Sequence, residues 1–531
     1  MKKPAMATVL WIFAILIIIT QSVEAQKNDQ KNLLFIITDQ QQYKAMSLAG
    51  NTELETPNLD RLARDGAFFR NAYAAAAVCA PARASILTGH TVENTGVLTN
   101  QQAYYYDESP VMTMPTFDEI LSENGYHCEY YGKWHTLSSK AEVYKNPKLQ
   151  SESGKSVFAH GGQRAVYMDY INEKFPKRAL KEGELYDTFT DRPYKPDPID
   201  VGYGLTQQEV KAQNIRRTQP NLHGKLMIPP EHSFTAFQAK ETIEAIERLQ
   251  DKTFSITCSF HFPHAPMIPP EPYYSMYPPE EMMPPKSISD DMLNSPYQRA
   301  NGRKAMPEYA DPEEIRYMIS NYYGLIKELD DWIGKIIDKV EELGLADKTM
   351  IVFTSDHGEM LGAHGMREKN VFYEESSHIP LAIKFPGEIK ENTVVDGYVS
   401  HIDIFATILD YLQIDQPASD GKSLRGLIEG TDDSYGKYVV TEWLWNGPTT
   451  PNYMIVKDGW KLMIPYSEDS KVINAMYNLE RDPIEMNNLL GKNPNRSSYK
   501  EKAEELRSDL VEWLQKNNSE HVVSVKKRDL I

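Results

Sequence analysis

Three short apolar runs that each end in polar residues constrain the fold of this chain most strongly. The runs and the residues that follow them are 31–38 with Asp39, 253–260 with His261, and 349–355 with Asp356. Continuous apolar runs of this length are typical of parallel strands buried on both faces. Because ligands bind outside the carboxyl ends of such strands, the three runs predict one shared site.

Helical periodicity between these runs sets the fold class. Residues 234–249 and 315–343 carry apolar side chains at spacings of three and four, and Gly344 ends the second helix. The alternation predicts an α/β fold: a large mixed, mainly parallel sheet sandwiched by helices. After residue 430, a smaller α+β subdomain on an antiparallel sheet is expected. It would be built from a strand at 438–441, a hairpin at 454–463 and a helix at 499–516.

Two stretches within this pattern look inserted. Residues 138–231 are rich in Lys, Tyr and Pro with weak periodicity, and residues 266–312 are dense in Pro, Met and Tyr. Long loops of this kind often form the substrate cleft of an enzyme, but surface elaboration is an equal alternative.

The first 25 residues have the pattern of an export signal. Lys2 and Lys3 precede an apolar run at 9–20, and Val-Glu-Ala at 23–25 provides a cleavage site. The run is short for a bilayer span, although an uncleaved anchor remains the alternative. We therefore expect a periplasmic or secreted protein with no stable membrane insertion after cleavage.

Charge and cysteine content exclude several classes. A net charge of −18 argues against nucleic acid as a partner, and it requires a locally basic pocket if the substrate is an anion. Three cysteines cannot form a disulfide framework. Cys128 and Cys258 lie in strand-like stretches, as buried thiols or as a single disulfide. Cys79 has different neighbours.

Cys79 begins the motif that carries the chemistry. The segment Cys79-Ala-Pro-Ala-Arg83, with Leu-Thr-Gly at 87–89, resembles the C-x-P-x-R signature of the type I, formylglycine-dependent sulfatases of the alkaline phosphatase-like superfamily. The chain from 34 to 490 is similar to the bacterial secreted polysaccharide sulfatases of this family. Further matching blocks, in the family's order, are LFIITD at 34–39, TPNLDRLARDG at 56–66, YGKWH at 131–135, SFHFPHAP at 259–266, FTSDHGEMLGAHG at 353–365 and YNLERDPIEMNNL at 477–489.

The resemblance implies a role for each matched residue. Cys79 would be oxidised to formylglycine (3-oxoalanine) by a formylglycine-generating or an anaerobic sulfatase-maturating enzyme. The hydrate of this aldehyde, at the N-terminus of a helix predicted over 81–89, would attack sulfur and form a covalent sulfate intermediate. The other implied roles are those of Arg83, which holds the hydrate and the metal-site carboxylates; Lys133 and Lys369, which contact sulfate oxygens; His135, which takes the proton of the second hydroxyl; and His264, which protonates the leaving oxygen.

The resemblance also implies one metal ion per chain. Its ligands would be Asp39, Gln40, Asp356, His357 and residue 79, and calcium is the usual metal of the family. Gln40 stands where many relatives have a second aspartate, and His357 where others have asparagine. Because these changes weaken the case for calcium, magnesium is the alternative.

These features together predict a sulfuric ester hydrolase, with an export signal (1–25), a sulfatase catalytic domain (26–430) and a C-terminal subdomain (431–531). The expected substrate is a sulfated polysaccharide or its oligosaccharides: an algal glycan such as ulvan or carrageenan, or a glycosaminoglycan. One alternative is a small ester such as choline or aryl sulfate. Another is a phosphodiesterase or phosphonate hydrolase of the same superfamily. A non-catalytic carbohydrate-binding relative would have lost catalytic residues, yet all are present.

Overall fold

The computed structural model describes residues 30–531 except 104–111, 138–142, 153, 155, 157, 159–162, 176–222, 227, 298–309, 433 and 446. The expected export signal at 1–25 lies outside the described residues, as do parts of both inserted stretches. Within the described part, no helix combines the length and the apolar character needed to cross a membrane.

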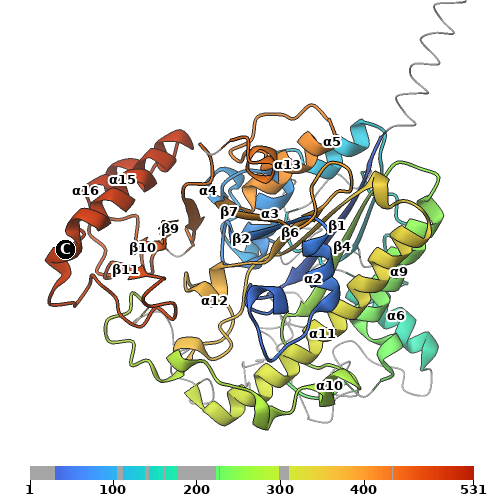
Figure 1. The fold of residues 1–531 in the computed structure, drawn as a ribbon, viewed down its shortest axis with the longest axis horizontal. Helices are drawn as coiled ribbons and strands as arrows, with labels where there is room; N and C mark the ends of the chain where they lie inside the picture. The colour runs from blue at the N-terminus through green and yellow to red at the C-terminus, as the bar shows by residue number, and fades with distance from the viewer. Residues whose placement is uncertain are drawn as a thin grey trace, which may run out of the picture.

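A seven-stranded sheet with the order β3-β4-β1-β5-β6-β2-β7 forms the centre of the molecule (Figure 1). Within it, β6 runs antiparallel to β5 and β2, and the other pairings are parallel, which confirms the mixed, mainly parallel sheet. Every residue of β1 is buried, as its continuous apolar run requires. The strands are β1 (Asn32–Asp39), β2 (Ala67–Tyr73), β3 (His127–Gly132), β4 (Phe254–Pro263), β5 (Thr349–Ser355), β6 (Leu381–Lys384) and β7 (Thr393–Ser400).

Helices cover both faces of this sheet (Figure 1). One group comprises α2 (Pro57–Arg64), α9 (Phe234–Leu249) and α11 (Pro312–Glu342), and the other α3 (Cys79–Thr88), α5 (Phe117–Glu123) and α13 (Ile402–Tyr411). The bounds of α9 match the prediction, because the Ser233 side chain accepts from Ala236 N and caps the helix. Helix α11 begins three residues earlier than predicted, at Pro312 after its Asp311 cap. The other helices of this part of the chain are α4 (Val92–Thr95), α6 (Arg164–Lys174), α10 (Tyr273–Met276), α12 (Glu374–Ser377) and α14 (Arg425–Glu429).

A second, four-stranded antiparallel sheet follows, with the order β11-β10-β9-β8. Asp458 and Gly459 have φ values of 49° and 70°, which suits the tight β9–β10 hairpin predicted there. Helices α15 and α16 lie on its outer side (Figure 1, red). The elements are β8 (Val439–Glu442), β9 (Tyr453–Lys457), β10 (Trp460–Ile464), β11 (Ala475–Asn478), α15 (Lys500–Lys516) and α16 (Val522–Lys527).

Candidate active site

The carboxyl ends of β1 and β5 bring the central residues of the site together. Asp39 ends β1, and Asp356 and His357 follow β5, its neighbour in the sheet. Cys79 Sγ lies 3.1 Å from His357 Nε2 and 3.8 Å from Asp39 Oδ1. All four side chains are buried, and one potential ligand atom from each lies within 4.8 Å of the others. The carboxyl ends of β1 and β5 therefore meet at one site, as predicted, whereas the third predicted strand continues past His261 and ends at Pro263.

Cys79 is the first residue of α3, so the helix begins two residues before the predicted start at 81. Val78 is extended and Gly89 ends the helix in the left-handed region, while Pro81 fits the first turn. Ala80 N–H donates to Asn100 Oδ1 at 3.0 Å and Pro81 has no N–H, so it is the dipole of the helix that favours an anion beside residue 79. Burial raises the pKa of the Cys79 thiol, but the charges of Lys133 and Lys369 outweigh it and leave that pKa below its ordinary value.

Asp39, Asp356 and His357 bring potential metal-ligating atoms together beside Cys79. His357 Nδ1 lies 2.9 Å from the carbonyl oxygen of Gly358 and donates to it. Its Nε2 faces Cys79 Sγ and lies 3.6 Å from Asp356 Oδ1. Two carboxylates and one imidazole nitrogen fit a divalent cation, while Gln40, the other expected ligand, has its amide oxygen on Lys369.

Gln40 has φ at 75°, and its side chain is held at both ends. Its Oε1 accepts a hydrogen bond from Lys369 Nζ at 2.6 Å, while its Nε2 donates to the buried Glu359. The backbone N–H of Gln40 donates to Asp356 Oδ1 at 3.0 Å. The sequence argument missed Glu359, although it stands in the matched block two residues after His357.

Basic side chains surround the carboxylates. Lys133 Nζ pairs with Asp39, and Arg83 Nε donates to Asp356 Oδ2 at 2.8 Å. Burial raises the pKa of Asp39, but Lys133 and the other nearby cations more than offset this and hold it well below its ordinary value. The site therefore gathers Lys133, Arg83 and Lys369 beside its carboxylates, cations that an anionic substrate would need on an acidic protein.

His264 lies 2.9 Å, at Nε2, from Lys369 Nζ. Its Nδ1 lies 2.7 Å from the carbonyl oxygen of Ala265, so Nδ1 donates and Nε2 accepts from the lysine. Burial, and then the charge of Lys369, lower the pKa of His264 well below its ordinary value. The ring is therefore neutral at neutral pH.

The Gly-Lys-Trp-His segment is fixed against β4. Gly132 has φ at 100°, and a Cβ there would overlap the carbonyl oxygen of Ser259. Lys133 N donates to that same oxygen at 2.8 Å. Arg83 Nη1 donates to Lys133 O at 2.9 Å and to Ser259 Oγ at 2.8 Å, a role for Ser259 that the sequence argument missed. His135 follows, buried and with φ at 47°.

The remaining singled-out residues lie away from these groups. Cys128 and Cys258 are free and buried, and burial raises the pKa of Cys258 to about 12. The buried-thiol alternative for these two therefore holds.

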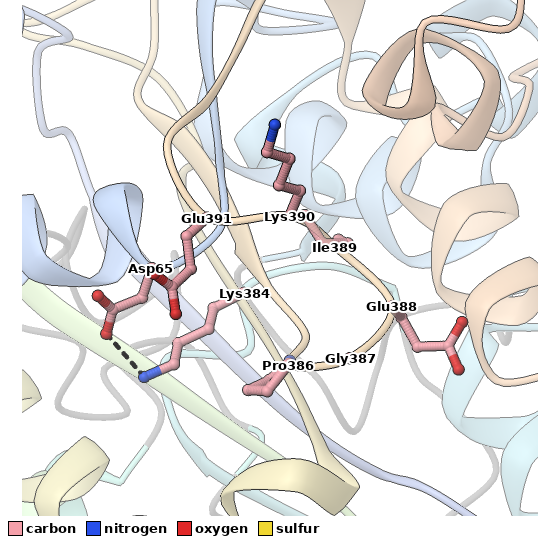
Figure 2. Close-up of a pocket in the computed structure, with 8 residues that line it drawn as sticks. All are labelled: Asp65, Lys384, Pro386, Gly387, Glu388, Ile389, Lys390 and Glu391. Atoms are coloured by element: carbon pink, nitrogen blue, oxygen red, sulfur yellow. Dashed lines mark hydrogen bonds and ion pairs between the residues drawn. The ribbon is translucent and has the colours of Figure 1, made fainter.

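A surface hollow of about 520 Å³ is separate from this site (Figure 2). It lies beside Lys384, which pairs in register with Ile351 near the start of β5, whereas Asp356 follows the end of that strand. Lys384 Nζ is paired with Asp65 at 2.9 Å and with Glu341 at 3.0 Å. Glu388, Lys390 and Glu391 also line the hollow, so it carries charges of both signs, away from the carboxyl ends of β1 and β5.

The sequence model of the sulfatase family matches residues 31–414. The chain belongs to the sulfatase family. A second model, for the C-terminal part of N-sulphoglucosamine sulphohydrolase, matches residues 362–516. This sulfatase is a sulfuric ester hydrolase, as the sequence predicted.

Named relatives of this sulfatase share most of its length. An arylsulfatase of Clostridium perfringens is 28% identical over 495 residues, which cover 91% of this chain and 94% of that protein. An N-acetylglucosamine-6-O-sulfatase of Bacteroides thetaiotaomicron is 27% identical over 523 residues, covering 92% and 88%. The solved phosphonate monoester hydrolase of Agrobacterium radiobacter superposes with a TM-score of 0.73 at 21% identity, covering 92% of this chain and 96% of that one. The last similarity supports the α/β fold.

Proposed function

We propose that this sulfatase acts on a sulfated polysaccharide or its oligosaccharides, with formylglycine formed from Cys79. One observation carries the proposal: Cys79 Sγ lies at a buried helix N-terminus, 3.1 Å from His357 Nε2, among carboxylates and lysines. The name of the N-acetylglucosamine-6-O-sulfatase indicates that one relative acts on a sugar sulfate, which supports a carbohydrate substrate.

The modified residue would supply what a thiol lacks, a hydrated aldehyde with two hydroxyl groups. The maturation partner is a formylglycine-generating or an anaerobic sulfatase-maturating enzyme. Only 1% of Cys79 is exposed in the folded protein, which supports conversion before folding is complete.

Lys133 and Lys369 would hold the oxygens of the sulfate group. Each ammonium already has an oxygen partner at the site, Asp39 for Lys133 and Gln40 for Lys369, so both charges are positioned before substrate arrives. Preorganised positive charge is most effective where water is excluded, and both side chains are buried. The N-terminus of α3 adds to the same potential.

His264 and His135 would handle the two protons of the reaction. Nε2 of the neutral His264 accepts from the Lys369 ammonium, so the proton that His264 passes to the leaving sugar oxygen would come from Lys369. His135, two residues after Lys133, would take the proton of the second hydroxyl so that sulfate is released. Arg83 would hold residue 79, Asp356 and the Lys133 segment in fixed positions relative to one another.

The donor set of Asp39, Gln40, Asp356, His357 and residue 79 would hold one calcium ion. When bound, the ion supplies positive charge that stabilises anionic oxygens at residue 79. Magnesium is the alternative. We also propose that the protein is exported, to the periplasm or beyond, on the strength of the signal pattern at 1–25.

Mass spectrometry of the tryptic peptide that ends at Arg83 tests the nucleophile. Protein produced with a maturation enzyme should show the mass loss of a thiol replaced by an aldehyde. C79A should abolish hydrolysis of every sulfate ester, while C258S, at a buried thiol away from the site, keeps it. An active wild-type protein with unmodified Cys79 would refute the mechanism.

A panel of defined sulfated oligosaccharides, with p-nitrophenyl sulfate, choline sulfate and a phosphonate monoester, tests the substrate. The highest kcat/KM should belong to an oligosaccharide. Faster turnover of a small sulfate, or of the phosphonate, contradicts the carbohydrate assignment.

A further inference from the structure

The loop between β5 and α12 carries Lys369 in a strained backbone. Glu368 and Asn370, on either side of the lysine, have φ values of 63° and 74°, which residues other than glycine rarely adopt. Such a conformation persists only where surrounding contacts hold it. One contact is near the nucleophile: Asn370 N donates to Ala77 O at 2.9 Å, two residues before Cys79.

The other end of this loop is held by the C-terminal sheet. Phe372, three residues after Lys369, donates from its N–H to Tyr297 Oη at 2.8 Å. Its carbonyl oxygen accepts a hydrogen bond from Lys461 Nζ, also at 2.8 Å. Lys461 lies on β10, so the loop is anchored by a residue of the second sheet. Figure 1 shows α12, which follows the loop, between the two sheets.

Lys461 is fully buried and paired with two carboxylates. Its Nζ lies 2.7 Å from Glu374 Oε1 and 2.8 Å from Glu485 Oε1. The other oxygen of Glu485 accepts from the backbone N–H of Glu374 at 2.7 Å, which fixes the start of α12. Glu374 also accepts a hydrogen bond from Tyr73 Oη at 3.1 Å and lies 3.0 Å from His378 Nδ1.

A buried charge of this kind is an expensive way to gain stability, because desolvation offsets most of the attraction. The arrangement instead fixes the positions of the groups that contact the ammonium. Three directed contacts from one ammonium fix the Phe372 carbonyl and the two carboxylates that define the end of the loop.

We infer that Lys461 is a positioning residue for Lys369: through Phe372 and Glu374 it fixes the loop that presents Lys369 to the sulfate group. The C-terminal sheet thereby takes part in catalysis without touching the substrate. This inference rests on the proposed role of Lys369 in binding sulfate oxygens.

The variant K461M, with K457M as its matched control, tests the inference. Lys457, on the adjacent strand β9, also pairs with two carboxylates, Asp509 at 2.7 Å and Glu505 at 3.3 Å, but both belong to α15. K461M should lower kcat/KM about 10- to 100-fold and weaken inhibition by inorganic sulfate by a similar factor, since a displacement near 1 Å has effects of this size. K457M should change neither. A folded K461M with wild-type inhibition by sulfate overturns the inference.

A double-mutant cycle with K369A separates positioning from general stability. If Lys461 acts through Lys369, then K461M lowers kcat/KM little further in the K369A background. If K461M lowers kcat/KM by the same factor in both backgrounds, the inference is overturned, but the proposed role of Lys369 is not affected. K369A with wild-type kcat/KM overturns the proposed role of Lys369, and the inference with it.

Should K461M fail to fold, E485Q replaces it in both experiments. This variant leaves the pair of Lys461 with Glu374 in place and removes one partner. It should weaken sulfate inhibition in the same direction by a smaller factor. A folded E485Q with unchanged sulfate inhibition also counts against the inference.

Discussion

Arg83 Nε and Asp356 Oδ2 lie 2.8 Å apart in a pair that is almost wholly shielded from water, with side-chain exposures of 2% and 0%. The same guanidinium donates to Lys133 O and to Ser259 Oγ. One side chain thus joins the helix of Cys79, the carboxyl end of β5 and the segment that carries Lys133.

Replacing Arg83 by lysine should distinguish the effect of its positive charge from that of its guanidinium geometry. R83K keeps a cation near Asp356 but loses the fork that reaches Lys133 O and Ser259 Oγ. We expect the free energy of unfolding to fall by about 1–3 kcal/mol for the two lost hydrogen bonds, and kcat/KM by about 100-fold. Urea titration measures the free energy of unfolding, and steady-state kinetics measure kcat/KM. R61K, at an exposed pair with Asp338, is the control and should leave kcat/KM unchanged.

Gly132 should tolerate no side chain. G132A places a methyl group against the carbonyl oxygen of Ser259, beside the Lys133 segment. G125A is matched, because Gly125 also has positive φ (87°) but a methyl group there would meet nothing within 4 Å. Thermal unfolding should show a small loss for G125A, on the order of 1 kcal/mol from backbone strain alone, and a several-fold larger one for G132A with loss of activity. Equal losses would mean that the close approach does not matter.

Removing divalent metal should lower both activity and stability. A metal ion that binds only the folded protein adds to its stability, so chelation should reduce the Tm as well as kcat. Addition of calcium should restore both, with magnesium less effective. D356N should lose the calcium-dependent rise in Tm. A chelated protein with full activity would argue against a metal at this site.

Glu328 should make stability depend on pH. Burial raises the pKa of this carboxyl to about 8, although Ser233 donates a hydrogen bond to it. Between pH 4.5 and about 8 the unfolded chain releases this proton and the folded protein retains it, so the free energy of unfolding falls as pH rises. The contribution lost is on the order of 5 kcal/mol.

The variant E328Q removes this titration. The Tm of E328Q minus that of wild type should therefore increase from about pH 5 to about pH 8. Any effect of the substitution that does not depend on pH shifts this difference equally at every pH. The surface variant E391Q is the control. A difference in Tm that stays flat with pH would show that Glu328 ionises normally in the folded protein.

Much of this architecture could be predicted from the apolar pattern of single strands and helices and from the rule that parallel strands share a carboxyl edge. The strand at 349–355 and the helix at 234–249 have the predicted bounds, since each is a single apolar pattern with a clear cap or polar end. That Asp39 and Asp356 meet follows from the shared carboxyl edge of parallel strands. The start of α3 was misplaced because Pro81 suits either the first or a later residue of the first turn.

Contacts between distant segments were not predictable from the sequence. Gln40 and Glu359 are 319 residues apart, and Lys461 and Phe372 belong to different parts of the fold, the second sheet and the loop after β5. Neither pair has a periodic signal, because each depends on where the sheet order places two loops. The antiparallel direction of β6 was likewise hidden, since its four buried residues look the same in either orientation.

The reversed direction of β6 has a practical consequence for handling the enzyme. It carries the chain from the catalytic edge of the sheet to the opposite edge, where Glu388 and Lys390 are exposed beside the hollow in Figure 2. A cysteine introduced at either position could take a fluorophore or a tether to a solid support. The immobilised molecule would then present its active face outward, free to meet a long and bulky polymer.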